Sequence, residues 1–579
     1  MEAVMTTLHS VSDIDFHPRT SLYPSPIDWR DQVMYFLLVD RFDNNDPNTP
    51  AYEPSNSGQH NTPDAGHQFQ GGNLKGIIRR LDYLQQLGCT TLWLSPILKN
   101  RQDMNDTYHG YGIQDFLEVD PRFGTLADLQ ALTQAAHERD MYVILDVVLN
   151  HTGDVWCYPE CYPYYYYQDQ VYPFGKWREA NPASGLQDDD AVWPLELQSP
   201  DVFKRRGEIR DWNNANESRN GDFLSLKELD LPQADVLDTL IKVYKYWVTS
   251  ADLDGFRIDT VKHMEHSATA IFCNAIREYA QRIGKHNFFI FGEIVADDFT
   301  IQKYIGRNSR IENTNERFPA LDAALDFPLY FILEEVIKGF ASPEFLRNRY
   351  EEFRNLYADH GEAGQYFVTF VDNHDQMARK YRRIMHNNPI KQQAVLAIGY
   401  LLTSQGIPCI YYGTEQGFDG GGADDSYVRE CMFGGTWGAF NSSGHHFFNS
   451  QHEIYQGIAS IATLRKQQAA LRYGRQYFRE TSSDGLNFGH PLDGHCTLAY
   501  SRILDTEEIL IAMNLDSQPR SDYVTVDYKL SASEHNMRNL MVNTTSDMAT
   551  QYQIDNRNGR ACVRISLPAY GMVMLKVTH

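Results

Sequence analysis

The chain has 579 residues and a net charge of −24, because 76 Asp and Glu outnumber 52 Lys and Arg. Hydrophobic residues make up 42% and aromatic residues 13%, which excludes a largely disordered chain and supplies a large core. The acidic charge argues against nucleic acid as a partner, because a phosphate backbone is bound through clustered Lys and Arg. It also argues against an anionic membrane surface, and no apolar run approaches the ~20 residues that would span a bilayer.

Residues 1–27 are polar and interrupted by prolines, and we expect them to form an N-terminal arm. They contain no basic segment followed by an apolar run, which is the pattern of an export signal. A cytoplasmic protein is therefore expected, with a secreted mature form as the alternative. The sequence leaves the oligomeric state open.

From residue 28 to 151, and again from 233 to 478, short apolar runs alternate with helical patterns, which predicts an α/β architecture. Such runs are typical of strands buried on both faces in a parallel sheet. Leu74–Leu87 carries an apolar stripe at helical spacing and is followed by Gly88, a helix stop signal. Thr125 and Asp128 have the spacing of a capping box. The runs are Val33–Leu38, Thr91–Leu94, Tyr142–Leu149, Phe288–Phe291, Phe367–Val371 and Cys409–Tyr412.

Two segments break this alternation. Residues 152–232 are rich in Tyr, Pro, Asn and Asp without periodicity, and a loop of that length is improbable inside a compact domain, so we expect a small inserted domain. In residues 479–579, apolar and polar residues alternate, which predicts a C-terminal antiparallel β-domain.

Of eight cysteines, only Cys157 and Cys161 are close in sequence, and both lie in the predicted insertion. Their spacing lacks a second Cys or His pair, which favours a loop disulfide or free thiols over zinc. Several of the other six lie in apolar runs, where a cysteine is usually a small buried hydrophobic residue.

Polar clusters follow four of the apolar runs on their C-terminal side. In a (β/α)8 barrel, the C-terminal ends of the strands converge on one mouth, where catalytic side chains collect. Four clusters at the same end of their strands therefore predict a single site. They are Asn150-His151, the polar residues of GFRIDTVKH (Gly255–His263), Gly292-Glu293 and Asp372–Asp375.

The carboxyl groups in these clusters suggest a reaction. Arg257 and Asp259 are two apart on a strand and face the same way, and the cation favours an ionised, nucleophilic Asp259. Glu293 would keep its proton, because the neighbouring charges of Asp259 and Asp375 raise its pKa. One ionised and one protonated carboxyl across a bond is the arrangement for glycoside hydrolysis. Asp146 is interpreted as a structural partner beneath the site.

In these residues the chain resembles the α-amylase superfamily, glycoside hydrolase family 13. The resemblance covers about residues 30–579. It implies a (β/α)8 TIM barrel with a small domain inserted after the third strand and a C-terminal antiparallel β-sandwich domain. The motifs are DVVLNH (Asp146–His151), GFRIDTVKH, FGEI (Phe291–Ile294), FVDNHD (Phe370–Asp375), LKELD (Leu226–Asp230), VDRF (Val39–Phe42), WLSPI (Trp93–Ile97), YHGYG (Tyr108–Gly112) and GIPCIYYGTE (Gly406–Glu415).

The resemblance also implies roles for individual residues. Asp259 would be the nucleophile that forms a covalent glucosyl-enzyme intermediate, and Glu293 would be the general acid and then the base. Asp375 would bind sugar hydroxyls and stabilise the transition state. The other residues expected to contact substrate or orient the site are His109, Tyr111, His151, Arg257, Lys262 and His374.

A structural Ca²⁺ between barrel and insertion is implied as well, and no organic cofactor. Its oxygen donors would be the Asn150 side chain, the Glu228 carboxylate and the His263 backbone carbonyl, and such ligands suit Ca²⁺ rather than zinc. Glu228 stands where Asp is usual. The run Asp40–Asn48 could hold another Ca²⁺ or form an Asx-rich turn.

The function implied by the resemblance is a retaining, α-amylase-like hydrolase of α-glucosidic linkages, acting on starch- or glycogen-type α-glucans or maltooligosaccharides. The alternative is a transglycosylase or isomerase on the same scaffold, of the 4-α-glucanotransferase, neopullulanase or trehalose synthase type. A more distant alternative is a non-catalytic glucan-binding accessory protein. Gly112 stands where many starch-acting members carry Trp, which leaves the preferred chain length open.

Overall fold

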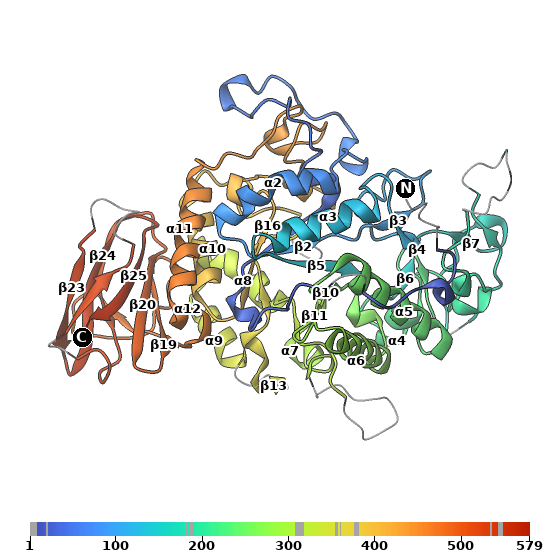
Figure 1. The fold of residues 1–579 in the computed structure, drawn as a ribbon. Helices are drawn as coiled ribbons and strands as arrows, with labels where there is room; N and C mark the ends of the chain where they lie inside the picture. The colour runs from blue at the N-terminus through green and yellow to red at the C-terminus, as the bar shows by residue number, and fades with distance from the viewer. Residues whose placement is uncertain are drawn as a thin grey trace.

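The computed structural model describes residues 8–578 except 19–20, 169, 180–182, 184, 186–189, 307–317, 354–356, 359–360, 376–380, 533–534 and 542–547. Figure 1 shows a central barrel with the inserted domain on one side and the C-terminal β-domain on the other.

Among the described residues, eight parallel strands form the barrel sheet in the order β12-β11-β10-β5-β2-β1-β16-β15. A parallel bridge between Leu325 and Val368 links the two edges, so the sheet nearly closes. All but two of the strands, β10 and β12, overlap the apolar runs, and the predicted (β/α)8 barrel is confirmed. The strands are β1 (Met34–Leu37), β2 (Thr91–Leu94), β5 (Tyr142–Val147), β10 (Gly255–Ile258), β11 (Phe289–Gly292), β12 (Ala323–Ala324), β15 (Val368–Thr369) and β16 (Ile407–Tyr411).

Helices cover the outside of the barrel (Figure 1). Helix α2 has the predicted bounds, with a side-chain cap from Asn73 and an end at Gly88, where φ is +99°. Thr125 and Asp128 form the predicted capping box of α3. The helices are α1 (Val39–Phe42), α2 (Leu74–Leu87), α3 (Leu126–His137), α4 (Ala215–Asn220), α5 (Ala234–Ala251), α6 (His266–Arg282), α7 (Asp298–Ile301), α8 (Phe327–Ile337), α9 (Glu344–Phe353), α10 (Lys391–Thr403), α11 (Glu453–Gln467) and α12 (Ala469–Tyr473).

The insertion between β5 and α5 has a small aromatic core, in which the ring of Trp156 contacts those of Tyr158 and Phe174, and the ring of Tyr158 also contacts that of Tyr172. Cys157 and Cys161 form a disulfide, which answers the question that their spacing left open. The tyrosines of 162–167 divide between two environments, because Tyr162, Tyr165 and Tyr167 are exposed whereas Tyr164 and Tyr166 face inward. The short strands in and near the insertion are β3 (Leu98–Asn100), β4 (Ile113–Val119), β6 (His151–Thr152), β7 (Trp156–Cys157), β8 (Lys176–Trp177) and β9 (Lys227–Glu228).

The C-terminal domain is an antiparallel sheet with a core of its own, as the alternating sequence predicts. Its first strand begins at Arg475, slightly before the expected residue 479. Another small pair, β13 (Tyr357–Ala358) and β14 (Gly361–Glu362), belongs to the barrel part of the chain. The domain's strands are β17 (Arg475–Phe478), β18 (Thr481–Ser482), β19 (Thr497–Leu504), β20 (Glu507–Asn514), β21 (Arg520–Thr525), β22 (Asn536–Asn539), β23 (Gln551–Arg557), β24 (Arg560–Leu567) and β25 (Met572–Thr578).

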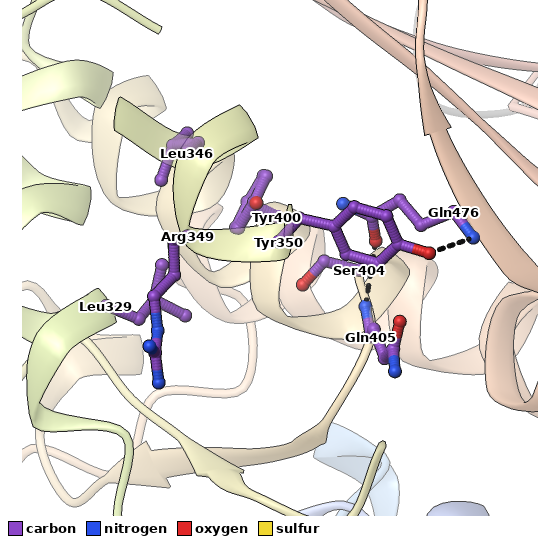
Figure 2. A pocket seen from close by; sticks show the side chains of 8 residues that line it. All are labelled: Leu329, Leu346, Arg349, Tyr350, Tyr400, Ser404, Gln405 and Gln476. Atoms are coloured by element: carbon purple, nitrogen blue, oxygen red, sulfur yellow. Dashed lines mark hydrogen bonds between the residues drawn. The ribbon is translucent and has the colours of Figure 1, made fainter. Parts of the chain in front are cut away.

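A small pocket lies where the barrel helices α8, α9 and α10 meet β17 (Figure 2). Gln476 from β17 accepts a hydrogen bond from Gln405 N at 2.9 Å, and its own backbone N–H donates to Tyr350 Oη at 3.1 Å. The pocket therefore belongs to the contact between barrel and β-domain.

The N-terminal arm packs against the rest of the chain along its described part. Val11 and Ile14 are buried, the backbone oxygen of His9 accepts a hydrogen bond from Leu195 N, and that of Phe16 accepts one from Tyr279 Oη. Among the described residues, no helix combines the length and the apolar character needed to cross a membrane.

Candidate active site

The carboxyl ends of three neighbouring barrel strands bring three carboxyl groups around one guanidinium. Arg257 on β10 pairs in register with Asp146 on β5, and Glu293 directly follows β11. Arg257 Nη1 lies 2.7 Å from Asp146 Oδ1 and 2.8 Å from Asp259 Oδ1. Arg257 Nη2 lies 2.5 Å from Glu293 Oε2. These four side chains are at most 5% exposed, so the charges interact with little solvent between them.

Asp375, which follows β15, reaches the same site from the other side of the barrel. Its Oδ1 accepts a hydrogen bond from Arg429 Nη2 at 2.8 Å, and its Oδ2 lies 3.5 Å from His374 Nε2. Its charge acts on both Asp259 and Glu293 and raises the pKa of each. The structure thus brings together the three carboxyl groups that were expected to meet at the barrel mouth.

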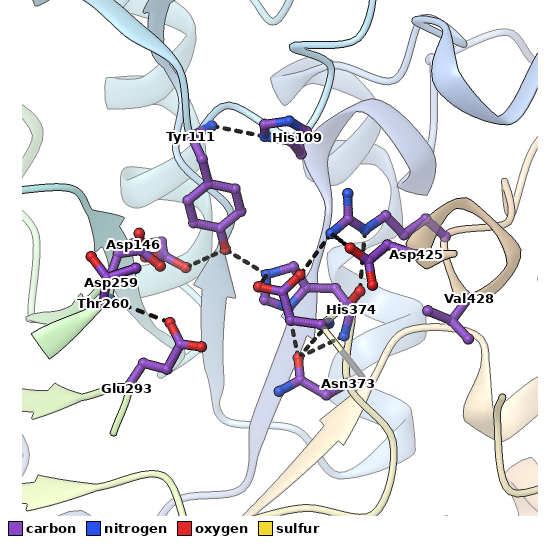
Figure 3. A network of polar contacts seen from close by, with 12 residues as sticks. His109, Tyr111, Asp146, Asp259, Thr260, Glu293, Asn373, His374, Asp425 and Val428 are labelled. Atoms are coloured by element: carbon purple, nitrogen blue, oxygen red, sulfur yellow. Dashed lines mark hydrogen bonds and ion pairs between the residues drawn. The ribbon is translucent and has the colours of Figure 1, made fainter. Parts of the chain in front are cut away.

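Tyr111 connects the two sides of the site (Figure 3). Its Oη lies 2.9 Å from Asp146 Oδ2 and 2.7 Å from His374 Nε2, and the rings of Tyr111 and His374 are stacked at 5.5 Å. Asp146 also accepts a hydrogen bond from Trp93 Nε1. Its side chain is fully buried and surrounded by these donors, in agreement with its interpretation as a structural partner.

The three carboxyl groups differ in protonation. Burial raises the pKa of Glu293 to about 8 against the attraction of Arg257, with Asp259 and Asp375 adding to the rise. Burial raises the pKa of Asp259 to about 6, whereas Arg257 and a hydrogen bond with Glu293 lower it. Arg257 therefore favours the ionised Asp259 as predicted, but it does not prevent a net rise, because it is shared by three carboxyl groups. At neutral pH, Asp259 is mostly ionised and Glu293 mostly protonated.

Burial alone would raise the pKa of Asp375, but His374 and Arg429 lower it to about 2. Burial lowers the pKa of His374 itself to about 3, so this ring is neutral at physiological pH. The lasting positive charge beside Asp375 is therefore Arg429, and Asp375 remains ionised throughout the neutral range.

The remaining predicted substrate-binding residues lie around this centre. His109 Nδ1 accepts a hydrogen bond from Tyr111 N at 3.1 Å, which fixes its ring on the same wall. His151 is buried, and among the described residues no group pairs with its Nε2 atom. Lys262 lies, partly exposed, in the short turn Val261–His263 that follows Asp259. The unpaired His151 nitrogen is the feature here that suits a hydrogen bond to a ligand hydroxyl.

Two site residues were missed by the sequence analysis. Arg429 contacts Asp375, donates to the backbone oxygen of His374 at 3.2 Å, and lies 3.4 Å from Asp425. Burial raises the pKa of Asp425 to about 7, and the charge of Asp375 adds to the rise. Both residues lie in the loop after β16. The nearest motif, GIPCIYYGTE, ends at Glu415, before both residues, but the rule that every strand of a barrel ends at the mouth points to this loop.

Of the three residues expected to hold Ca²⁺, one does not fit the ion. Asn150 turns its amide nitrogen to Glu228, with Nδ2 2.6 Å from Oε2. The other carboxylate oxygen, Oε1, lies 3.5 Å from Lys204 Nζ. The His263 backbone carbonyl stays a predicted donor, because the contact of this residue is made by its ring, with Nδ1 2.7 Å from Ser218 O. A Ca²⁺ on Glu228 would lie beside an ammonium group, so Glu228 is the expected donor that does not fit the ion, whereas the buried Asn150 Oδ1 has no partner among the described residues.

The run Asp40–Asn48 forms Asx turns, the second of the two alternatives. The side chain of Asp43 accepts a hydrogen bond from Asn45 N, and that of Asp46 accepts one from Asn48 N. Asp43 is also paired with Arg79 and Arg80.

Known proteins are similar to this chain along most of its length. The "Beta/alpha-amylase" of Paenibacillus polymyxa is 32% identical over 458 residues, covering 78% of this chain and 31% of the relative. The "Cyclomaltodextrin glucanotransferase" of Klebsiella oxytoca is 28% identical, covering 77% of this chain and 66% of the relative. The matched region thus spans about a third of the length of the Paenibacillus protein and about two thirds of the length of the Klebsiella protein.

Among solved structures, the α-amylase of Geobacillus thermoleovorans, complexed with acarbose, superposes with a TM-score of 0.69 at 27% identity. The match covers 96% of this chain and 100% of that one. The family profile described as "Alpha amylase, catalytic domain" matches residues 36–474, which include the barrel and all three carboxyl groups. The chain belongs to the α-amylase family.

Proposed function

We propose that the chain is a retaining glycoside hydrolase that cleaves α-glucosidic linkages in α-glucans and maltooligosaccharides, in the manner of an α-amylase. The observation that carries the proposal is the pair Asp259 and Glu293. Both carboxyl groups contact Arg257, yet at neutral pH one is mostly ionised and the other mostly protonated. A nucleophile and an acid side by side meet the requirement for double displacement at a sugar carbon.

In the first step, an Asp259 oxygen attacks the anomeric carbon while the glycosidic bond breaks. Glu293 gives its proton to the departing glycosidic oxygen, so the leaving chain is released as an alcohol. Arg257 orients both carboxyl groups through separate nitrogens of one rigid group. Asp375 is ionised at this pH and stabilises the positive charge that develops on the sugar ring.

In the second step, Glu293 is a carboxylate and takes a proton from water, whose oxygen attacks the anomeric carbon. The bond to Asp259 breaks, and the nucleophile returns to its ionised form. Two inversions at one carbon retain the α configuration. The unpaired Nε2 of His151 and the stacked ring of Tyr111 supply polar and flat contacts for a sugar.

Support for an α-glucan as the substrate class comes from the relatives. The Geobacillus protein is described as complexed with acarbose, and another structural neighbour as complexed with maltotriose. The second candidate function is glucan transfer, in which a sugar hydroxyl replaces water in the second step. It is favoured by the similarity to cyclomaltodextrin glucanotransferases, one of which is a solved structure described as having a three-domain ABC distribution.

Product analysis tests both candidates. The purified chain is incubated with soluble starch and with maltoheptaose, and the products are separated by chromatography. Shorter linear oligosaccharides with new reducing ends support hydrolysis, whereas longer or cyclic products support transfer. Unchanged carbohydrate in both cases would favour a non-catalytic, glucan-binding protein. Asp259→Asn is the matched control and should lower turnover on the order of 10⁴-fold, because the amide cannot form the covalent intermediate.

A further inference from the structure

We propose that the Lys204 ammonium is a built-in cation that ties the inserted domain to the barrel, in place of a structural calcium ion. The inference rests on the contacts of Lys204 and is independent of the reaction that the barrel catalyses.

Three acceptors surround the ammonium group. Lys204 Nζ lies 2.5 Å from the backbone oxygen of Arg219 and 3.0 Å from Glu265 Oε1. The third acceptor, Glu228 Oε1, lies at 3.5 Å. An ammonium group has three N–H donors and no acceptor, so two carboxyl groups and a carbonyl match its bonding capacity. The Lys204 side chain is 4% exposed, and solvent screens these contacts little.

These contacts join two parts of the fold. Lys204, Arg219 and Glu228 belong to the insertion, and the backbone N–H of Lys204 also donates to the Glu228 carbonyl at 3.1 Å. Glu265 belongs to the barrel, where it is the residue before α6, and it follows the turn Val261–His263. This segment begins directly after Asp259. The ammonium therefore connects the insertion to the segment that carries the proposed nucleophile.

Other acidic side chains at this junction are matched by cations in the same way. Lys227 Nζ lies 3.6 Å from Asp154 and 4.0 Å from Asp222, and Arg178 lies 2.8 Å from Asp154. A Ca²⁺ added beside Lys204 would meet the repulsion of a buried positive charge, which is strong where solvent is excluded. The charge that an ion would supply is thus present in the side chains.

Removing Lys204 should allow the junction between insertion and barrel to bind a calcium ion. Buried oxygen atoms of Asn150 and Glu265 have no partner among the described residues, and Glu228 Oε1 and the Arg219 carbonyl would then lose their contact with Lys204. Such oxygens are the ligands that Ca²⁺ prefers. Lys204→Ala is therefore expected to create a dependence on calcium that the wild type lacks.

The test is thermal unfolding of the wild type, Lys204→Ala and Arg205→Ala, each in excess EDTA and in millimolar CaCl₂. The wild-type Tm should be the same in both solutions. Lys204→Ala should unfold roughly 5–10 °C lower in EDTA, and CaCl₂ should recover part of the loss. Arg205→Ala is the matched control, because Arg205 pairs with an exposed Asp201 at 3.1 Å, and its Tm should stay near that of the wild type.

A wild-type Tm that falls in EDTA and returns with Ca²⁺ would overturn the proposal. A Lys204→Ala Tm equal to that of Arg205→Ala would overturn it as well. If Lys204→Ala does not fold, the wild-type comparison decides alone, supported by calorimetric titration of the wild type with CaCl₂. Because all readouts are unfolding or binding, they are unaffected if the proposed hydrolase activity fails its own test.

Discussion

The two sides of the candidate active site differ in how many carboxyl groups share one arginine. On the side formed by β5, β10 and β11, Asp146, Asp259 and Glu293 share Arg257, and each has a raised pKa. On the side that follows β15 and β16, Arg429 contacts Asp375, whose pKa is lowered to about 2. Asp146, Asp259, Glu293 and both arginines are buried, whereas the Asp375 side chain is 21% exposed.

This difference indicates that the number of acids sharing one arginine determines which carboxyl group keeps a proton. One guanidinium cannot offset the desolvation of three acids, so a proton remains on that side of the site and is available to a leaving group. Arg429 is shared by only two acids, and Asp375, which lies nearer to it than Asp425 does, stays ionised and can stabilise positive charge. The four predictions that follow test this division, beginning with the largest expected effect.

Arg257→Met should lower kcat/KM by about 10³-fold, because both reacting carboxyl groups lose their shared cation. The pKa of Asp259 should rise above its value of about 6, so the acidic limb of the pH profile should move to higher pH. The measurement is kcat/KM on maltoheptaose across the pH range. Arg257→Lys is the matched control, since it keeps the positive charge but not the forked guanidinium that contacts several carboxyl groups. The acidic limb of its pH profile should move less. An unmoved limb in Arg257→Met would contradict the sharing of charge.

Arg429→Met should have a smaller effect at neutral pH, about 10- to 100-fold. The pKa of Asp375 starts from about 2, so a rise of about two units still leaves this group ionised at neutral pH. The loss in kcat/KM should become larger as the solution is made more acidic, because protonation of Asp375 then reaches the working range. If Arg429→Met lowered kcat/KM as much as Arg257→Met does, and the loss did not increase at acid pH, the two sides of the site would not differ as described.

The pH dependence of the wild type should be bell-shaped. Asp259 must be ionised, so kcat/KM rises with pH through about 6, and Glu293 must be protonated, so kcat/KM falls through about 8. One pH unit outside either limb should cost about tenfold. Glu293→Gln should remove the basic limb from the residual activity. A basic limb that persists in this variant would assign the proton to another group.

Much of the fold follows from local patterns in the sequence. The bounds of Leu74–Leu87 could be predicted because an apolar stripe and a glycine stop act within one helix. The barrel strands could be predicted because strands buried on both faces require continuous apolar runs. The packing of the N-terminal arm could not be predicted, because it depends on partners such as Leu195 and Tyr279 that are far away in sequence.

In the candidate site, too, some features could be predicted from local sequence and others could not. Asp259, Glu293 and Asp375 were found because each ends an apolar run within a motif. The sharing of Arg257 by three acids, and hence the raised pKa of Asp259, depends on strand order, which the composition of a strand does not reveal. Lys204 was missed for a related reason, because nothing near it in sequence shows that it faces Glu228 and Glu265.

Tyr111→Phe should have the smallest effect of the four, because it removes one hydroxyl and keeps the ring. The hydroxyl contacts Asp146 on one side of the site and His374 on the other, so its loss removes a link between the two sides. A typical intramolecular hydrogen bond contributes about 0.5–1.5 kcal/mol, which corresponds to a roughly two- to tenfold fall in kcat/KM. Tyr111→Ala is the matched comparison and should lose more, mainly in KM, because the stacking surface is lost as well. If Tyr111→Phe lowered kcat/KM as much as Tyr111→Ala does, the hydroxyl and not the ring would be the main contribution of this residue. The two sides of the site would then depend on each other through that single oxygen.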